Sequence, residues 1–450
     1  MTNVTKLPPM AGVLLGTFFY ELSDTVLYLV QPLFFPTLLR LIGLFIVGYY
    51  LSKASFDKIH SSITPFFNFL IIWSVIIVLR GSLMGNVIPG GSLSLPYILR
   101  RLFLDSFGAL SFFIPLLALM KVKLNSLYYI KRMGILFCLI ALVMTYMARE
   151  QIAYGQLTNG MTTILNVDGD YISVRNLIHA TFPGFGVILF ALFCSNYING
   201  FKTLLFPVAI FVFFLVMAIG GGRGDTIFNL MYLLMYLFML ITYSKVKKHT
   251  NRVDKIAGKI FALSLGAFFA VTLIYLYTKT DVFDYVLERA FGGREMSTNI
   301  EDSSRDILVR DMTSDINAHP LDWIWGRGVN GSYATQHLGV NGRRAWMEWG
   351  FRYLILKGGV VYLFLVVLCW IHAIYMGLFK SKNVLSKSLA CMCIAALIGL
   401  SSTNSEPQYT TFFILSWFSF GMLERKEIRM MSDDDLYGYF NVKNYNRIGS

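Results

Sequence analysis

A glutamate among aromatic residues and arginines is the strongest candidate for catalysis in this sequence. Glu348 follows Trp346 and lies close to Arg343, Arg344 and Arg352. A carboxylate that is partly removed from water has a raised pKa, so it can accept a proton from a hydroxyl group at neutral pH. We therefore expect Glu348 to act as a general base, with Arg343 or Arg344 orienting it. The alternative is an ordinary salt bridge between Glu348 and one of these arginines.

Arg223 is a second candidate, in a cluster of glycines between two apolar segments. The cluster has the sequence Gly220-Gly-Gly-Arg-Gly-Asp225. Glycines let a ligand approach the backbone closely and leave amide groups able to bind it. An arginine near bilayer depth is costly, so it indicates function unless it snorkels from a tight helical hairpin. No Gly-Lys-Ser/Thr sequence follows, which excludes a nucleotide-binding P-loop.

Further arginines gather in a long polar stretch from Asp281 to Arg352. Arginine presents a rigid fork of donors that fits phosphate, whereas lysine acts as a point charge. We therefore predict that a phosphate or pyrophosphate group is bound by residues of this set: Arg305, Arg310, Arg327, Arg343, Arg344 and Arg352. Alternatively, some of them pair with local acids: Glu288, Asp302, Asp306 and Asp311. Arg305 and Arg310 would reach one ligand from an irregular segment but would diverge on a single helix.

Four of the seven tryptophans lie in the same stretch: Trp323, Trp325, Trp346 and Trp349. Their rings suit stacking on sugars, and they equally suit the interfacial belt of a membrane protein. We include Trp346 among the expected substrate-binding residues, as a stacking platform for a sugar ring.

No metal or cofactor site is expected. All five cysteines fall in apolar segments, and Cys391-Met-Cys393 lacks the spacing of metal ligands. Asp168-Gly-Asp170 is too short for a calcium loop, and no Gly-x-Ser-x-Gly motif occurs. His179 is a weaker candidate, since lone histidines at the end of a span are more often hydrogen-bonded fillers.

Membrane-spanning helices must position these residues. The 450 residues are 56% hydrophobic and 14% charged, whereas soluble domains carry about 25% charged residues. A span needs roughly 17–25 mainly apolar residues. Such segments cover approximately 31–51, 63–80, 106–120, 132–148, 179–196, 202–221, 225–243, 260–278, 353–375, 387–402 and 408–424. A segment at about 10–30 contains Glu21 and Asp24, so it is either a further span or an interfacial helix. The expected fold is all-α, a polytopic integral membrane protein of about 11–12 transmembrane helices.

Lysines set the orientation of these helices. Cytoplasmic loops are enriched in basic residues, and the block from Lys245 to Lys259 is the strongest such signal. Placing it inside divides the chain into four parts: transmembrane residues 1–280, a large extracytoplasmic loop 281–352, transmembrane residues 353–424 and a cytoplasmic tail 425–450. We expect the tail to be loosely attached from Met430 onward. The net charge of +13 is scattered between apolar spans, which argues against nucleic-acid binding.

These motifs resemble the O-antigen polymerase and O-antigen ligase superfamily of bacterial membrane glycosyltransferases. The resemblance covers the number of helices, the late outward loop and Gly221-Gly-Arg223-Gly. It also covers the spaced Arg305 and Arg310 and the turn Gly326-Arg-Gly328-Val-Asn-Gly331-Ser-Tyr333. Ten positions separate Glu348 from Gly359, which matches the polar residue and helix-opening glycine of the family. Glu348-Trp349 stands where the family usually has His-Asn, which favours a polymerase over a ligase.

The resemblance implies a GT-C-like fold in the bacterial inner membrane, with the site on the periplasmic or exterior face. It implies that an undecaprenyl-pyrophosphate-linked oligosaccharide is transferred onto another lipid-linked repeat unit, without a metal or cofactor. Arg223 with Arg305 or Arg310 would stabilise the leaving pyrophosphate, and Glu348 would be the base. Membrane lipids and a polysaccharide chain-length regulator are the other expected partners. The alternatives are a ligase that moves polymer to a lipid or protein acceptor, and a flippase without bond chemistry.

Overall fold

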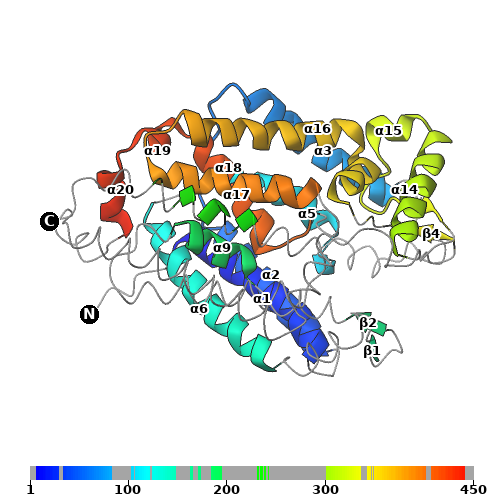
Figure 1. Cartoon of the computed structure of the whole chain (residues 1–450), viewed down its shortest axis with the longest axis horizontal. Coiled ribbons are helices and arrows are strands. Elements are labelled where there is room, and N and C mark those ends of the chain that lie inside the picture. Colours follow the sequence, from blue (N-terminus) through cyan, green and yellow to red (C-terminus); the bar gives the residue numbers. More distant parts are fainter. Residues whose placement is uncertain are drawn as a thin grey trace, which may run out of the picture.

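The computed structural model in Figure 1 describes most of the two ends of the chain and the second half of the polar stretch. The described residues are 7–29, 34–83, 103–105, 107–121, 124–147, 163–165, 171–173, 184–194, scattered positions from 231 to 242, 301–335, 342–345, 347, 349–401 and 407–440. The predicted spans at 202–221 and 260–278 lie outside these residues, as do Arg223, Trp346 and Glu348.

Most of the described residues are helical, which confirms the all-α part of the prediction. The long helices are α1 (Pro9–Leu29), α2 (Phe34–Leu51), α3 (Thr64–Leu83), α6 (Asn125–Met147), α14 (Glu301–Asn317), α16 (Gly350–Phe379), α17 (Val384–Ser401) and α18 (Thr411–Glu424). The short ones are α5 (Ala109–Phe113), the 3-10 helix η2 (Ile114–Leu119), α9 (Phe185–Phe193), α15 (Leu321–Trp325), α19 (Lys426–Met430) and α20 (Asp433–Phe440). Two antiparallel pairs join β1 (Thr163–Leu165) to β2 (Tyr171–Ser173) and β3 (Tyr333–Ala334) to β4 (Arg343–Arg344).

Two of the described helices are long and apolar enough to cross a membrane, Thr64–Gly81 within α3 and Gly350–Phe379. Shorter apolar helices cover 35–51, 109–119, 384–400 and 411–424. Large apolar side chains are exposed on α2, α3, α6 and α16: Phe45, Ile72, Leu139, Phe364 and Phe379. The predicted span at 106–120 is a five-residue α-helix followed by a 3-10 helix. Pro115 is the second residue of the 3-10 helix, and its missing N–H cannot continue the hydrogen bonds of the α-helix.

The two acids in the first apolar segment do not interrupt its helix, since α1 continues from Pro9 to Leu29. The Glu21 carboxylate accepts hydrogen bonds from the amides of Gly184, at 2.6 Å, and Thr411, at 2.8 Å. These amides lie at the N-termini of α9 and α18, where a negative charge is favourable. Glu21 therefore joins the starts of two other helices to α1.

The C-terminal segment is packed against the helices as far as Leu436, so the prediction of a loose tail is wrong for this part. Asn383 donates from its side-chain amide to the carbonyls of Ile428, at 2.7 Å, and Met431, at 3.1 Å. Asp433 accepts from the amide of Val384 at 2.8 Å and so caps α17. The side chain of Leu436 is fully buried.

The helices α3, α16, α17 and α18 form a layered bundle with α14 and α15 at one end and α19 and α20 at the other (Figure 1). Near the end that carries α19, His372 Nδ1 lies 2.8 Å from the buried Glu424 carboxylate, which joins α16 to α18. The hydroxyl of Ser62, before α3, lies 3.1 Å from the other ring nitrogen of His372. The described part of the polar stretch lies at the opposite end of the bundle.

Candidate functional site

A glycine-rich turn fixes the polar stretch to the helical bundle. It follows α15 and contains Gly326 and Gly328, whose φ angles of 66° and 77° favour glycine. The amides of Arg327 and Gly328 donate to the carbonyls of Leu356, at 2.8 Å, and Lys357, at 2.9 Å, in α16. The next amide donates to the carbonyl of Ile77 in α3 at 3.1 Å. The turn therefore lies between two apolar helices and touches the backbone of both.

Close backbone contact explains why the sequence places glycines on both sides of this junction. A Cβ atom at Gly328 would lie 2.3 Å from the amide nitrogen of Gly81. A Cβ atom at Gly359 would lie 1.9 Å from the carbonyl oxygen of Ile324, and Gly359 has a φ of 73° that kinks α16. The sequence predicts that Gly359 opens this helix. Instead, the helix begins at Gly350 and is kinked at Gly359.

Two tryptophans reinforce the junction. Trp325 stacks on Trp73 of α3 with ring centroids 4.8 Å apart and an interplanar angle of 6°. The indole nitrogen of Trp73 also donates to the carbonyl of Gly358 at 2.7 Å. Trp325 is therefore occupied by a protein ring, whereas Trp349 is exposed before the first turn of α16.

Five alternating charges extend across the junction: Arg80, Asp322, Arg327, Asp315 and Arg343. We refer to these five side chains as the charge ladder. Arg80 Nη2 lies 2.9 Å from Asp322 Oδ1, and Arg327 Nε lies 2.7 Å from Asp322 Oδ2. Arg327 Nη1 also contacts Asp315 Oδ2, which lies 3.7 Å from Arg343 Nη2. The ladder thus joins α3, α14, α15 and the β3–β4 pair.

Arg327 is the buried centre of the charge ladder. Its side chain is only 2% exposed, and all three of its nitrogens donate to protein oxygens. Its acceptors are the two aspartates and the carbonyl oxygens of Asp315 and Ser332. The prediction that Arg327 binds phosphate is therefore replaced by a structural role. The alternative of pairing with acids holds here, although the acids differ from the four that the sequence suggested.

Asp315 stays ionised because of its neighbours. Burial alone would raise the pKa of its carboxyl group. Hydrogen bonds from Arg327 and the amide of Ala334, together with the charges of Arg327 and Arg343, outweigh burial and hold the pKa below its usual value. Asp315 is thus a permanent anion between two guanidinium groups at neutral pH.

The β3–β4 pair brings Arg343 and Arg344 to the glycine-rich turn. Arg343 Nε donates to the Ser332 hydroxyl at 2.9 Å, and its Nη2 donates to the Ser332 carbonyl at 3.0 Å. Arg344 stands opposite Tyr333 and is buried. Lys357, also buried, donates to the carbonyl of Gly331 at 2.7 Å. Basic side chains from two segments, β4 and α16, therefore lie around the turn.

The other predicted arginines are more dispersed. Arg305 and Arg310 both belong to the single helix α14. The segment is thus one helix and is not irregular, and five positions on an α-helix correspond to a rotation of about 140°. Arg310 is exposed, and Arg352 is half-buried in the first turn of α16.

The charge ladder includes three residues that the sequence did not single out: Arg80, Asp315 and Asp322. Arg80 is the last residue of a predicted apolar span, a position that also suits an ordinary interfacial arginine. The two aspartates carried a weak signal, since they lie in the arginine-rich stretch. Nothing in their spacing indicated that Arg327 would be their common partner.

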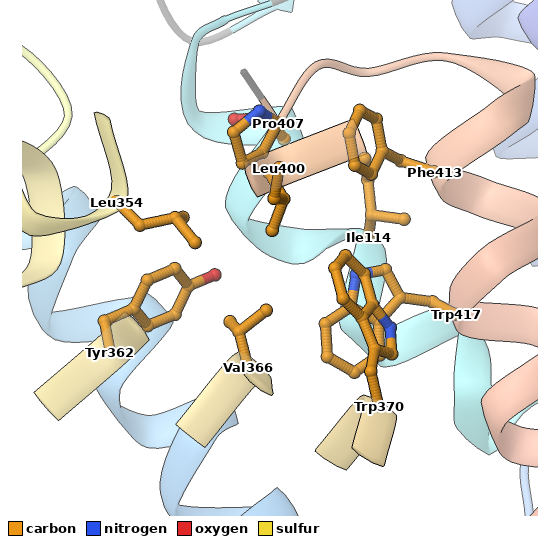
Figure 2. Close-up of a pocket in the computed structure, with 10 residues that line it drawn as sticks. Ile114, Leu354, Tyr362, Val366, Trp370, Leu400, Pro407, Phe413 and Trp417 are labelled. Atoms are coloured by element: carbon orange, nitrogen blue, oxygen red, sulfur yellow. The ribbon is translucent and has the colours of Figure 1, made fainter. Parts of the chain in front are cut away.

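A small pocket lies inside the bundle and apart from the charge ladder (Figure 2). Figure 2 shows Tyr362 and Val366 of α16 on one side of it, and Trp370 of α16 beside Phe413 and Trp417 of α18 on the other. It leaves room for roughly one water molecule. The pocket contains no predicted site residue, so it gives no support to a catalytic role.

No family model, curated protein or solved structure matches this chain.

Proposed function

We propose that this chain is a polytopic glycosyltransferase of the bacterial inner membrane that polymerises oligosaccharide repeat units. The observation that carries the proposal is the junction at the glycine-rich turn. An arginine-rich segment is fixed to the ends of two apolar helices, α3 and α16, through the backbone amides of the turn, and to α3 also through the Arg80–Asp322 ion pair. A site built this way holds guanidinium groups at the end of apolar helices, where the head group of an anionic lipid would lie.

Membrane insertion is supported by the helices and their surfaces. Two of the described helices are long and apolar enough to span a bilayer. Exposed Phe45, Phe364 and Phe379 would be unfavourable in water and favourable against lipid chains. The glycine-rich turn and the His372–Glu424 pair lie at opposite ends of α16, which fits a helix with one end on each side of the membrane.

The proposed reaction joins two repeat units. The acceptor is the hydroxyl group at the non-reducing end of one lipid-linked unit. Its oxygen forms a bond with the anomeric carbon of the donor glycan, and the bond from that carbon to undecaprenyl pyrophosphate breaks. Glu348 takes the hydroxyl proton, and the pyrophosphate leaves with its electron pair. Negative charge grows on that group in the transition state, so arginines such as Arg223 accelerate the step.

Variants of the two catalytic candidates test this function in cells. A deletion strain is complemented with the wild-type chain, Arg223→Ala or Glu348→Gln, and envelope glycans are separated on a gel. We expect both variants to lose long polymer, because removing a charge stabiliser or a general base costs about 10²–10⁴-fold in rate. Glu427→Gln is the matched control, since Glu427 is exposed on α19.

The glycan pattern separates this proposal from its alternatives. A missing polymerase leaves products with a single repeat unit. A missing ligase leaves intact polymer on its lipid carrier. Unchanged long polymer in the Arg223→Ala and Glu348→Gln strains would show that the catalytic assignment is wrong.

A further inference from the structure

We propose that Ser62, His372 and Glu424 form a second active site, which hydrolyses fatty acyl esters of membrane lipids. The three side chains come from the turn before α3, from α16 and from the last residue of α18. They lie at the end of α16 opposite to the glycine-rich turn, so the inference is independent of the proposed function.

The contacts between the three side chains form a relay. The Ser62 hydroxyl lies 3.1 Å from Nε2 of His372, and Nδ1 of the same ring lies 2.8 Å from Glu424 Oε1. A carboxylate only accepts hydrogen bonds, so Nδ1 carries the proton of the neutral ring and Nε2 accepts from the serine. A nucleophile, a base and a group that orients the base, each within hydrogen-bond reach of the next, is the arrangement of serine hydrolases.

Among the described residues, the Glu424 carboxylate serves His372 alone. Its side chain is fully buried, and its second oxygen, Oε2, has no hydrogen-bond partner there. The neighbouring Arg425 donates to the carbonyls of Gly421, at 3.1 Å, and Met120, at 3.0 Å. An unpaired buried carboxylate oxygen is costly in a purely structural contact. In a hydrolase, a buried carboxylate at this place stabilises the imidazolium that forms when the histidine takes the serine proton.

A tight turn presents Ser62 to solvent. The amide of Thr64 donates to the carbonyl of Ser61 at 3.1 Å, which places Ser62 and Ile63 at the centre of the turn. The Thr64 hydroxyl donates to the carbonyl of Ile59 at 2.7 Å and accepts from the amide of Ser61 at 3.0 Å. The turn is therefore fixed on both sides, while Ser62 itself is exposed.

Two backbone amides beside the nucleophile can stabilise the charge that forms in the reaction. In the described contacts, the amides of Ser62 and Ile63 donate to no protein acceptor. They directly precede α3, whose dipole favours negative charge at this end. The amide that follows a nucleophilic serine is also the place of an oxyanion donor in other hydrolases.

The proposed reaction has two steps. Ser62 Oγ bonds to the carbonyl carbon of the ester, and its proton passes to His372 Nε2. The bond from that carbon to the alcohol oxygen breaks, and the alcohol leaves with the proton from His372. Water then attacks the acyl-serine while His372 takes a proton from it, and the proton returns to Ser62 as the fatty acid leaves.

Exposed apolar side chains beside the relay favour a lipid as the substrate. Phe66 follows Ser62 by four positions and is 44% exposed, and Ile371 precedes His372 and is 52% exposed. Tyr375 is also exposed, with Nζ of Lys380 5.8 Å from its ring centre. Tyrosine and lysine together are typical of the interface between membrane and water. The ester bonds of glycerolipids lie at this depth, between head groups and acyl chains.

Labelling with a fluorophosphonate probe tests the nucleophile in the purified full-length protein in detergent. This probe forms a covalent bond with activated serines. We expect mass spectrometry of the peptides to locate the label on Ser62. Ser61→Ala is the matched control and should be labelled like the wild type, since the Ser61 hydroxyl has no partner in the described contacts.

Variants of the relay should lose the label for separate reasons. Ser62→Ala removes the nucleophile and should keep the melting temperature of the wild type, because Ser62 is exposed. His372→Gln removes the base and should slow labelling about 10²–10⁴-fold. A wild-type protein that is folded but not labelled at Ser62 would overturn the inference.

Glu424 acts through His372 and is a positioning residue, which hydrolysis of p-nitrophenyl butyrate can test. We expect Glu424→Gln to lower kcat about 10²–10⁴-fold at unchanged KM, because the amide no longer fixes the ring tautomer. A lower melting temperature with unchanged kcat of the folded protein would show that Glu424 only supports packing, which would overturn its role.

Reconstitution into vesicles tests the substrate class. The vesicles consist of diester phosphatidylethanolamine and phosphatidylglycerol, and vesicles of the corresponding diether lipids are the control. We expect the wild type to release free fatty acid from the diester vesicles only, and Ser62→Ala to release none. Hydrolysis of p-nitrophenyl butyrate without release of fatty acid from the vesicles would overturn the assignment of a lipid ester.

Discussion

At the residue scale, the arginines that looked equivalent in the sequence differ in role because their burial differs. Arg327 is enclosed with two aspartates, whereas Arg343 is half-buried and Arg310 is exposed. A buried guanidinium must be fully hydrogen-bonded to offset its lost hydration. Burial depends on the packing of α3 and α16 around the turn, and no local sequence pattern encodes it.

Asp315 makes the fold sensitive to acid. Its pKa is lower in the folded chain than in the unfolded one, where aspartate titrates near pH 3.9. Its stabilising effect is therefore complete above that value and is lost as the pH falls toward the folded pKa. We expect Asp315→Asn to be less stable than the wild type at pH 7 and the difference to shrink below about pH 4.

Thermal unfolding in detergent between pH 7 and pH 3 measures this effect. Asp434→Asn is a suitable control, because Asp434 is exposed on α20. A difference between wild type and Asp315→Asn that stays constant over the whole range would contradict the role given to Asp315.

At the element scale, the apolar spans predicted from composition are close to the helices of the described chain. The predictions of 31–51, 63–80 and 408–424 compare with helices at 34–51, 64–83 and 411–424. Their apolar length was enough to find them. What composition could not show is how the polar stretch reaches them, since that depends on a kink at Gly359 and on close contact at Gly81.

Alanine at Gly328 should weaken the junction. Its φ of 77° is strained for any residue with a side chain. In addition, the new Cβ atom would lie 2.3 Å from the backbone nitrogen of Gly81. Gly342→Ala is the matched control, because Gly342 has a φ of 74° with nothing within 4 Å. We expect Gly342→Ala to lower the free energy of unfolding by about 1 kcal/mol and Gly328→Ala to lower it by clearly more.

Thermal melts of both variants give this comparison directly. Both variants carry the strain of a left-handed backbone. The difference between their melting temperatures therefore reports the crowding at Gly81 alone. Equal destabilisation would mean that the turn does not depend on its contact with α3.

At the scale of the whole molecule, buried and partly buried polar groups connect the parts of the chain. Glu21 joins α1 to the starts of α9 and α18, and the charge ladder joins α3 to the polar stretch. The sequence alone marks Glu21 as an interruption of an apolar segment and Arg80 as the end of a span. Their partners are far away in the sequence, so their roles became visible only through the tertiary contacts.

The central claim is that the chain forms glycosidic bonds between lipid-linked repeat units. A strain that lacks the chain should accumulate these lipids, and they can be extracted as substrate for proteoliposomes that contain the purified protein. Mass spectrometry of the products is the decisive measurement. We predict glycans of two or more repeat units together with released undecaprenyl pyrophosphate, and neither product with Glu348→Gln. Unchanged single-repeat lipids in the presence of the folded wild-type protein would contradict the account.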